Sequence, residues 1–81
     1  MKETIFVSEK TGRIIYGMRN RLNCTQAEFG KKIGLSQPEM SAIELGKVAV
    51  KPETVQKIAD RFGINPMAIT GQVPMNWASL C

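Results

Sequence analysis

The sequence contains no histidine, and its 81 residues include only two cysteines, Cys24 and Cys81. These scarcities remove the usual zinc-ligand spacings and every catalytic arrangement that needs an imidazole base. A glycine-rich phosphate loop is also missing, and a chain this short has too little bulk for a deep substrate pocket. We therefore expect a protein that is not an enzyme and that has no metal site and no cofactor.

Long apolar runs are missing as well. No stretch approaches the roughly 18 apolar residues that a membrane-spanning helix needs, and Met1-Lys2-Glu3 does not lead into the apolar core of a signal peptide. We expect a cytoplasmic protein with no membrane partner and with reduced thiols. Cys24 is then most simply read as a small buried hydrophobe.

Size and charge leave several functions open. A chain of 81 residues is one domain at most. A domain of this size buries only about 60% of its unfolded surface, so its core must be compact and helical or shared with a second subunit. The net charge of +4 permits a nucleic-acid partner without requiring one.

Two helix-start signals of the same kind lie close together between Thr25 and Lys47. Thr25 is followed three residues later by Glu28, and Ser36 by Glu39, so each pair can form a capping box. Helices are predicted to begin at about Gln26 and at Gln37, the second running to Leu45. Gly34 suits the left-handed residue that ends the first helix, which leaves room only for a sharp bend.

The apolar positions indicate how these two helices meet. Phe29, Ile33, Leu35, Met40 and Ile43 recur at three- or four-residue steps or fall at the bend, which predicts one apolar inner corner. Gly30 lies on that inner side, where a missing side chain lets the second backbone cross close to the first. The face left outside carries Gln37, Pro38, Glu39, Ser41, Ala42 and Leu45.

Three further helices complete an all-α, five-helix bundle. They are predicted from about Thr11 to Leu22 with Ser8 or Thr11 as cap, from Pro52 to the stop at Gly63, and from Pro66, capped by Asn65, to Gly71. The predicted organisation is an N-terminal arm over residues 1–10, a domain over residues 11–71 and a C-terminal tail over residues 72–81. The Ile5-Phe6-Val7 run in the arm is compatible with a short strand, a cover over the core, a dimer contact or a loose terminus.

The tail is too apolar for a solvated linker. Val73, Met75, Trp77 and Leu80 alternate roughly with polar or small residues, so something should cover Trp77. The candidates are the domain's own core, the N-terminal arm and a second copy of the chain. A dimer contact and packing within one chain remain equally open.

The central segment resembles the helix-turn-helix of the phage repressor and Cro (XRE-like) family. The resemblance runs from about Ile14 to Gly71. It is carried by Gln26, Gly30, Gly34, Met40, Ile43 and the closing Glu44-Leu45-Gly46-Lys47. It implies a DNA-binding regulator whose second motif helix enters the major groove while the first lies across the DNA backbone.

On this hypothesis the base-reading candidates lie on the outer face of the helix that begins at Gln37. The amide of Gln37 can pair with adenine, and Pro38 and Ala42 can touch a thymine methyl group. Glu39 either accepts from cytosine or serves its capping box. Ser41 can reach a base or a phosphate.

Phosphate contacts are expected around that helix rather than on it. The resemblance implies that Gln26 hydrogen-bonds a phosphate. The candidates for the salt-dependent contacts are Arg13, Lys31 or Lys32, Lys47 and Lys51. Because the reading helix has no lysine or arginine, affinity must come from these flanking groups and from a doubled site, on an operator rich in A·T.

The resemblance also implies a structural role for one pair of charges. Arg19 and Glu44 match positions at which an arginine of the first helix and the glutamate of the closing signature form a semi-buried ion pair. This pair would brace the reading helix without touching DNA.

Two functions from different classes follow. The first is a homodimeric transcriptional repressor that binds double-stranded DNA at a palindromic operator. The alternative is a protein-interaction module of the same fold, such as an antitoxin, whose apolar arms bind a protein partner: a toxin or the transcription machinery. The apolar runs Ile5 to Val7 and Val73 to Leu80 are the features that keep the alternative open.

Overall fold

The computed structural model describes residues 9–80, and these residues form helices and connecting segments without any strand. The predicted all-α class with five α-helices is confirmed. Most of the predicted N-terminal arm, including Ile5 to Val7, lies outside the described residues. The elements are α1 (Glu9–Arg21), α2 (Gln26–Ile33), α3 (Gln37–Glu44), α4 (Pro52–Phe62), α5 (Pro66–Ile69) and a final 3-10 turn, η1 (Trp77–Leu80).

The first helix begins earlier than the sequence predicts. α1 already includes Glu9 and Lys10, which were assigned to the arm. Thr11 is only 1% exposed and lies within the helix, so the alternative in which it caps the helix is wrong. The other predicted cap, Ser8, lies outside the described residues. Beyond the end of α1, Asn23 adopts a left-handed conformation with φ 60° and turns the chain toward α2.

Both predicted capping boxes are present at the starts of α2 and α3. The Thr25 amide donates to Glu28 Oε1 over 2.8 Å, and the Glu28 amide donates to Thr25 Oγ1 over 3.1 Å. The corresponding distances for Ser36 and Glu39 are 2.8 and 3.3 Å. Gly34 caps α2 with φ 78°, a value that costs glycine little, and the next helix begins three residues later.

Two glycines allow α3 to approach its neighbours closely. A Cβ atom on Gly30 would collide with the Leu35 carbonyl oxygen and crowd Met40, so the tight bend between α2 and α3 needs a residue without a side chain there. A Cβ atom on Gly12 would collide with the carbonyl oxygen of Ile43. The α1 backbone therefore packs directly against the C-terminal turn of α3.

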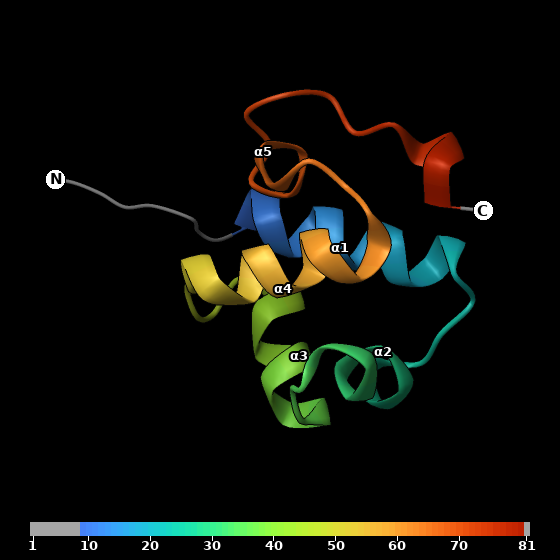
Figure 1. Ribbon diagram of the computed structural model, residues 1–81. Helices are drawn as coiled ribbons and strands as arrows, with labels where there is room; N and C mark the ends of the chain where they lie inside the picture. The colour runs from blue at the N-terminus through green and yellow to red at the C-terminus, as the bar shows by residue number, and fades with distance from the viewer. Residues whose placement is uncertain (1–8, 81) are drawn as a thin grey trace, which may run out of the picture.

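The core lies where α1, α2, α3 and α4 converge. The phenyl rings of Phe29 and Phe62 stack with centroids 5.4 Å apart. Figure 1 shows α2 and α3 together at one end of the molecule, with α5 and the tail at the other end. The contiguous buried apolar cluster consists of Ile15, Met18, Phe29, Ile33, Met40, Ile43, Val50, Val55, Ile58, Ala59 and Ile69.

The tail packs on its own chain. Met75 and Trp77 are half-buried against the core, and the indole of Trp77 lies over Gly17, where an added Cβ would be 2.9 Å from the ring. The guanidinium of Arg21 covers the indole, with its Cζ 4.6 Å from the ring centroid. Of the three covers considered for Trp77, the structure shows the domain's own core.

Candidate nucleic-acid interface

The outer edge of α3 carries every residue expected to read bases. Met40 and Ile43 face the core, so the opposite side of this helix turns outward. Gln37, Pro38 and Glu39 are exposed, and Ser41 and Ala42 are half-buried. The helix begins after a sharp turn and lies at one end of the molecule (Figure 1).

Glu39 is already engaged in holding the start of α3. Its carboxylate accepts from the Ser36 amide over 2.8 Å, and the Ser36 hydroxyl accepts from the Glu39 amide. The hydrogen bond from the Ser36 backbone amide is the largest cause that lowers the pKa of Glu39, and the side chain of Ser36 and the charge of Lys51 lower it further. The structure therefore shows the capping role, whereas the cytosine contact stays a prediction.

Arg19 and Glu44 meet beneath the reading helix in a two-pronged ion pair. Arg19 Nε lies 2.8 Å from Glu44 Oε2, and Nη2 lies 3.1 Å from Oε1. The side chains are 14% and 5% exposed. Arg19 also donates through Nη1 to the Cys24 carbonyl oxygen over 2.9 Å, and the bond to Glu44 raises the pKa of Arg19. This pair ties the end of α3 to α1 and to the turn before α2.

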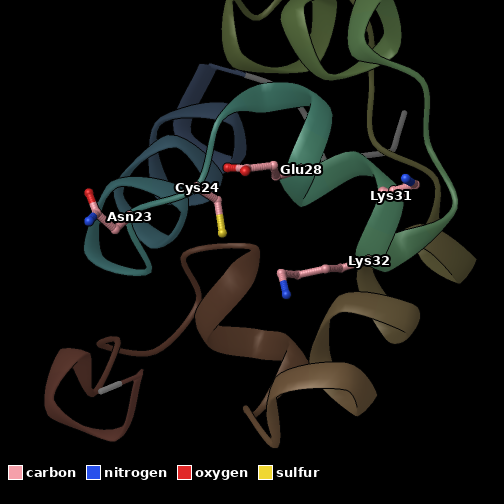
Figure 2. A pocket seen from close by; sticks show the side chains of 5 residues that line it. All are labelled: Asn23, Cys24, Glu28, Lys31 and Lys32. Atoms are coloured by element: carbon pink, nitrogen blue, oxygen red, sulfur yellow. The ribbon is translucent and has the colours of Figure 1, made fainter.

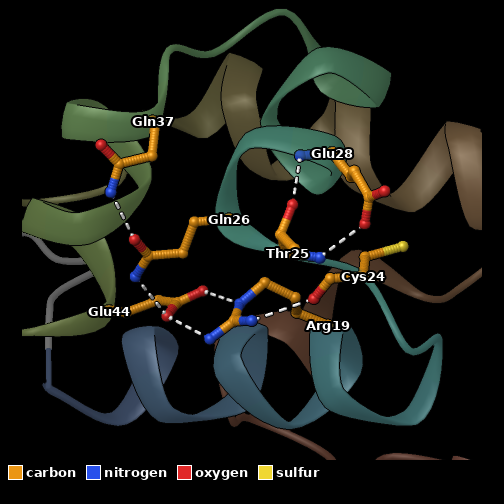
Figure 3. Close-up of polar contacts among 7 residues, drawn as sticks. All are labelled: Arg19, Cys24, Thr25, Gln26, Glu28, Gln37 and Glu44. Carbon is orange, nitrogen blue, oxygen red and sulfur yellow. Dashed lines mark hydrogen bonds and ion pairs between the residues drawn. The ribbon is translucent and has the colours of Figure 1, made fainter.

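The ion pair continues into a hydrogen-bonded chain that reaches the first residue of α3. Gln26 Nε2 donates to Glu44 Oε1 over 3.0 Å, and Gln37 Nε2 donates to Gln26 Oε1 over 2.6 Å. Figure 3 shows the four side chains of this polar chain, which we define as Arg19, Glu44, Gln26 and Gln37. The predicted phosphate contact of Gln26 stays a prediction, because here its side chain links Glu44 to Gln37.

A hollow of about 350 Å³ lies beside the polar chain, between α1 and α3. It brings Arg13 and Ser41, two of the predicted contact residues, together with Gln26. It is also lined by Tyr16 and Leu45, which are 49% and 64% exposed. Tyr16 lies over Arg19, with the ring centroid 5.3 Å from Cζ.

Tyr16 is not among the contact residues that the sequence suggests, and Leu45 is suggested only as an outward position. A signal for Tyr16 was available, because it lies three residues from both Arg13 and Arg19 on one helix. Of these two arginines Arg19 is bound to Glu44, whereas Arg13 lines the same hollow as Tyr16, so a hydroxyl group and a cation of the kinds that can contact phosphate share this surface.

A second hollow, of about 420 Å³, follows the other side of α3. Pro38 and Ala42 form one wall, and the loop after α3 supplies Val48, which is 46% exposed, and Lys51. The two residues expected to contact thymine methyl groups therefore share an apolar surface with a side chain that the sequence did not suggest. Lys51 lies at its edge.

Lys31 and Lys32 lie apart from this surface. Together with Asn23, Cys24 and Glu28 they line a separate hollow of about 420 Å³ at the junction of α1 and α2 (Figure 2). The structure thus groups Arg13, Gln26 and Lys51 with the outer edge of α3, and it does not group Lys31 with them. Lys47 is exposed in the loop after α3, where its amide donates to the Ala42 carbonyl oxygen over 2.9 Å.

Other kinds of site find no support in residues 9–80. Within this range no three histidine, cysteine, aspartate or glutamate side chains come together as metal ligands. None of the helices in the same range is long and apolar enough to cross a membrane.

Comparison with known proteins gives one match. A family model described as Helix-turn-helix (HTH_3) matches residues 15–69, which span α1 from its middle to the end of α5. Searches of curated proteins and of solved structures gave no match.

Proposed function

The chain belongs to the helix-turn-helix family, as an XRE-type DNA-binding regulator, and from this premise we propose that it is a homodimeric repressor acting in the cytoplasm on a palindromic operator. In this proposal α3 enters the major groove with Gln37 and Pro38 foremost, and Ser41 and Ala42 follow one turn later. The N-terminus of α2 lies against the DNA backbone.

The observation that carries the proposal is that the exposed first residue of α3, Gln37, is supported by hydrogen bonds from within the protein. Gln37 is exposed and yet held by Gln26, which is held in turn by the buried Glu44. A polar side chain fixed in direction before it meets its ligand loses less conformational entropy on binding. Hydrogen bonds to Gln26 and Glu44 are not expected for a surface glutamine that only contacts water.

The residues on this edge favour A·T base pairs. A glutamine amide matches the donor and acceptor of adenine, and the apolar surface of Pro38, Ala42 and Val48 matches the methyl group of thymine. Arginine and lysine, the usual partners of guanine, are missing from α3. We therefore propose an operator with A·T steps where Gln37 and Ala42 approach the bases.

Phosphate contacts supply the sequence-independent part of binding. Arg13 and Tyr16 line the hollow on one side of α3, Lys51 lines the hollow on the other side, and Lys47 is exposed in the loop after α3. Each cation that neutralises one phosphate steepens the salt dependence of binding by about 0.9 in log–log slope. Because so few cations flank one helix, specific affinity needs two copies on two half-sites, which is the basis for proposing a homodimer.

Selection from a randomised duplex pool at two salt concentrations tests the proposal. We expect enrichment of a palindrome whose half-sites lie about one helical turn apart, with A·T pairs at the positions that Gln37→Ala relaxes. Salt-sensitive retention without sequence enrichment would contradict it. A single stoichiometric protein partner from the native host, with no retention of DNA at moderate salt, would instead favour an antitoxin-like interaction module.

A further inference from the structure

We propose that Glu44 determines whether Gln37 prefers adenine or guanine in DNA, although the side chain of Glu44 is itself buried and does not contact a base. Acting through Gln26, its carboxylate fixes the direction of the Gln37 amide so that Gln37 matches adenine and mismatches guanine. Glu44 and Gln26 are positioning residues in this scheme. The inference rests on the proposed function, because it needs Gln37 to meet a base edge.

The first step is the chemistry of the carboxylate. Glu44 is 5% exposed and is bound through both oxygens by the guanidinium of Arg19, so it is ionised and can only accept hydrogen bonds. Whatever group lies against Glu44 Oε1 must therefore donate. For Gln26 this means that the amide nitrogen turns toward Glu44, as its 3.0 Å contact shows.

The second step follows from the two ends of an amide. With its nitrogen toward Glu44, Gln26 turns its carbonyl oxygen toward Gln37. An oxygen accepts, so Gln37 must also present its nitrogen, and the 2.6 Å bond from Gln37 Nε2 to Gln26 Oε1 has this sense. One hydrogen of the Gln37 amide is thereby used, and the second hydrogen and the carbonyl oxygen remain for a ligand.

The third step is the match to a base. In the major groove adenine offers the N7 acceptor and the N6 amino donor, which one N–H and one C=O of Gln37 satisfy together. Guanine offers two acceptors, N7 and O6, and would leave the Gln37 oxygen facing another oxygen. If the amide of Gln37 turned over, its oxygen would accept from Gln26 and would also face N7 of the base, while one hydrogen would face position 6, where it matches the O6 acceptor of guanine and mismatches the amino group of adenine.

The test compares affinities for two duplexes that differ at one base pair. That base pair is the one in the selected half-site at which Gln37→Ala loses its preference. Wild type should bind the adenine duplex about tenfold more tightly than the guanine duplex, a factor that corresponds to about 1.4 kcal/mol. The ratio is the readout, because partial unfolding of a variant lowers both affinities by the same factor.

Two variants should change the orientation of the Gln37 amide: one frees it, and the other reverses it. In Arg19→Met/Glu44→Leu no carboxylate faces Gln26, so both amides can turn over and the adenine-to-guanine ratio should fall below about threefold. In Gln26→Lys the new ammonium group only donates, so it should bind Glu44 and the Gln37 oxygen together and move the preference toward guanine. Gln56→Lys is the matched control: it makes the same charge change at an exposed glutamine of α4, and should leave the ratio unchanged.

Each result decides the inference. A double variant that keeps the wild-type ratio overturns it, and so does a Gln26→Lys variant that still prefers adenine as strongly as wild type. If the double variant does not fold, Gln26→Lys alone decides. If wild type selects a palindrome but Gln37→Ala changes no base preference, or the preference that it loses is not one of adenine over guanine, the inference fails while the proposed function stands. If wild type selects no sequence, both fail.

Discussion

Removing one partner of the Arg19–Glu44 ion pair should destabilise the protein far more than removing both. Glu44→Leu leaves a guanidinium that is only 14% exposed in wild type and retains the Cys24 carbonyl as its acceptor. Arg19→Met leaves a carboxylate that is 5% exposed and retains one donor, Gln26. An uncompensated buried charge costs about 3–5 kcal/mol, and the better-solvated arginine should lie at the lower end of that range.

The double variant Arg19→Met/Glu44→Leu should lose about 1 kcal/mol or less, because apolar side chains of similar volume replace a buried pair at little cost. The two single losses would then sum to at least about 6 kcal/mol, so the coupling free energy should be about 5 kcal/mol. For a domain of this size 1 kcal/mol corresponds to a shift of about 4–8 °C in Tm. Glu44→Leu alone should therefore lower Tm by about 12–24 °C.

Thermal and urea unfolding, followed by circular dichroism and by fluorescence of Trp77, measure these losses. Trp77 is the single tryptophan and packs on α1, so it reports the loss of the bundle. Arg61→Met is the control, because it removes an exposed arginine of α4 whose Cζ lies 5.6 Å from the Phe62 ring centroid. Small losses that add without coupling would refute the interpretation of Arg19–Glu44 as a desolvated brace.

Three further predictions concern single positions. Gly12→Ala should destabilise the protein by about 1–3 kcal/mol in urea unfolding, because the new methyl group collides with the Ile43 carbonyl oxygen; unchanged stability would contradict the close α1–α3 approach. The lowered pKa of Glu39 means that its contribution to stability is present above its unfolded-state pKa and is lost as the pH falls through its folded-state pKa. Glu39→Gln keeps a capping acceptor that does not titrate, so in urea titrations its free energy of unfolding should fall less on acidification than that of wild type. Glu53→Gln is the control. If wild type and both variants lose the same stability in acid, the assignment of the acid-sensitive cap to Glu39 is wrong. Lys47→Ala should weaken binding to specific and scrambled duplexes alike and reduce the log–log salt slope by about 1, and a change in sequence preference instead would argue against a phosphate contact.

Local chemistry is what made the helix-turn-helix predictable. A capping box needs only residues three apart, and a left-handed stop needs only Gly34, so both starts and the bend could be placed from the sequence. The apolar corner followed from helical spacing, and the structure buries Phe29, Ile33, Met40 and Ile43. The spacing of apolar residues identifies the buried side of α3, and the outer edge is the side opposite to it.

Errors occurred where distant parts of the chain decide the outcome. Thr11 has the chemistry of a cap, yet it lies inside α1 and is buried. Gly12 carries no prediction, because its role in the close approach of α1 and α3 appears only once α3 crosses α1. Packing of the tail against Gly17 was likewise one of several open alternatives, because spacing along the chain does not say which surface covers Trp77.

The polar chain shows the same limit within the candidate site. Resemblance to a family suggests that Arg19 and Glu44 pair, but no pattern in the sequence indicates that Gln26 bridges Glu44 and Gln37. Those contacts join residues 18 and 11 positions apart and depend on the angle between α2 and α3. The sequence therefore suggests only a phosphate contact for Gln26, whereas in the structure its side chain accepts a hydrogen bond from Gln37.

The most direct test of a base-reading α3 is the affinity for duplexes in which single atoms of the contacted adenine are removed. Replacing that adenine by 7-deazaadenine deletes the N7 acceptor in the major groove and should weaken binding about tenfold, whereas 3-deazaadenine, altered in the minor groove, should bind as the unmodified duplex does. Gln37→Ala should be insensitive to both changes. Equal binding of wild type to the 7-deaza and unmodified duplexes, or a loss confined to 3-deazaadenine, would contradict the insertion of α3 into the major groove.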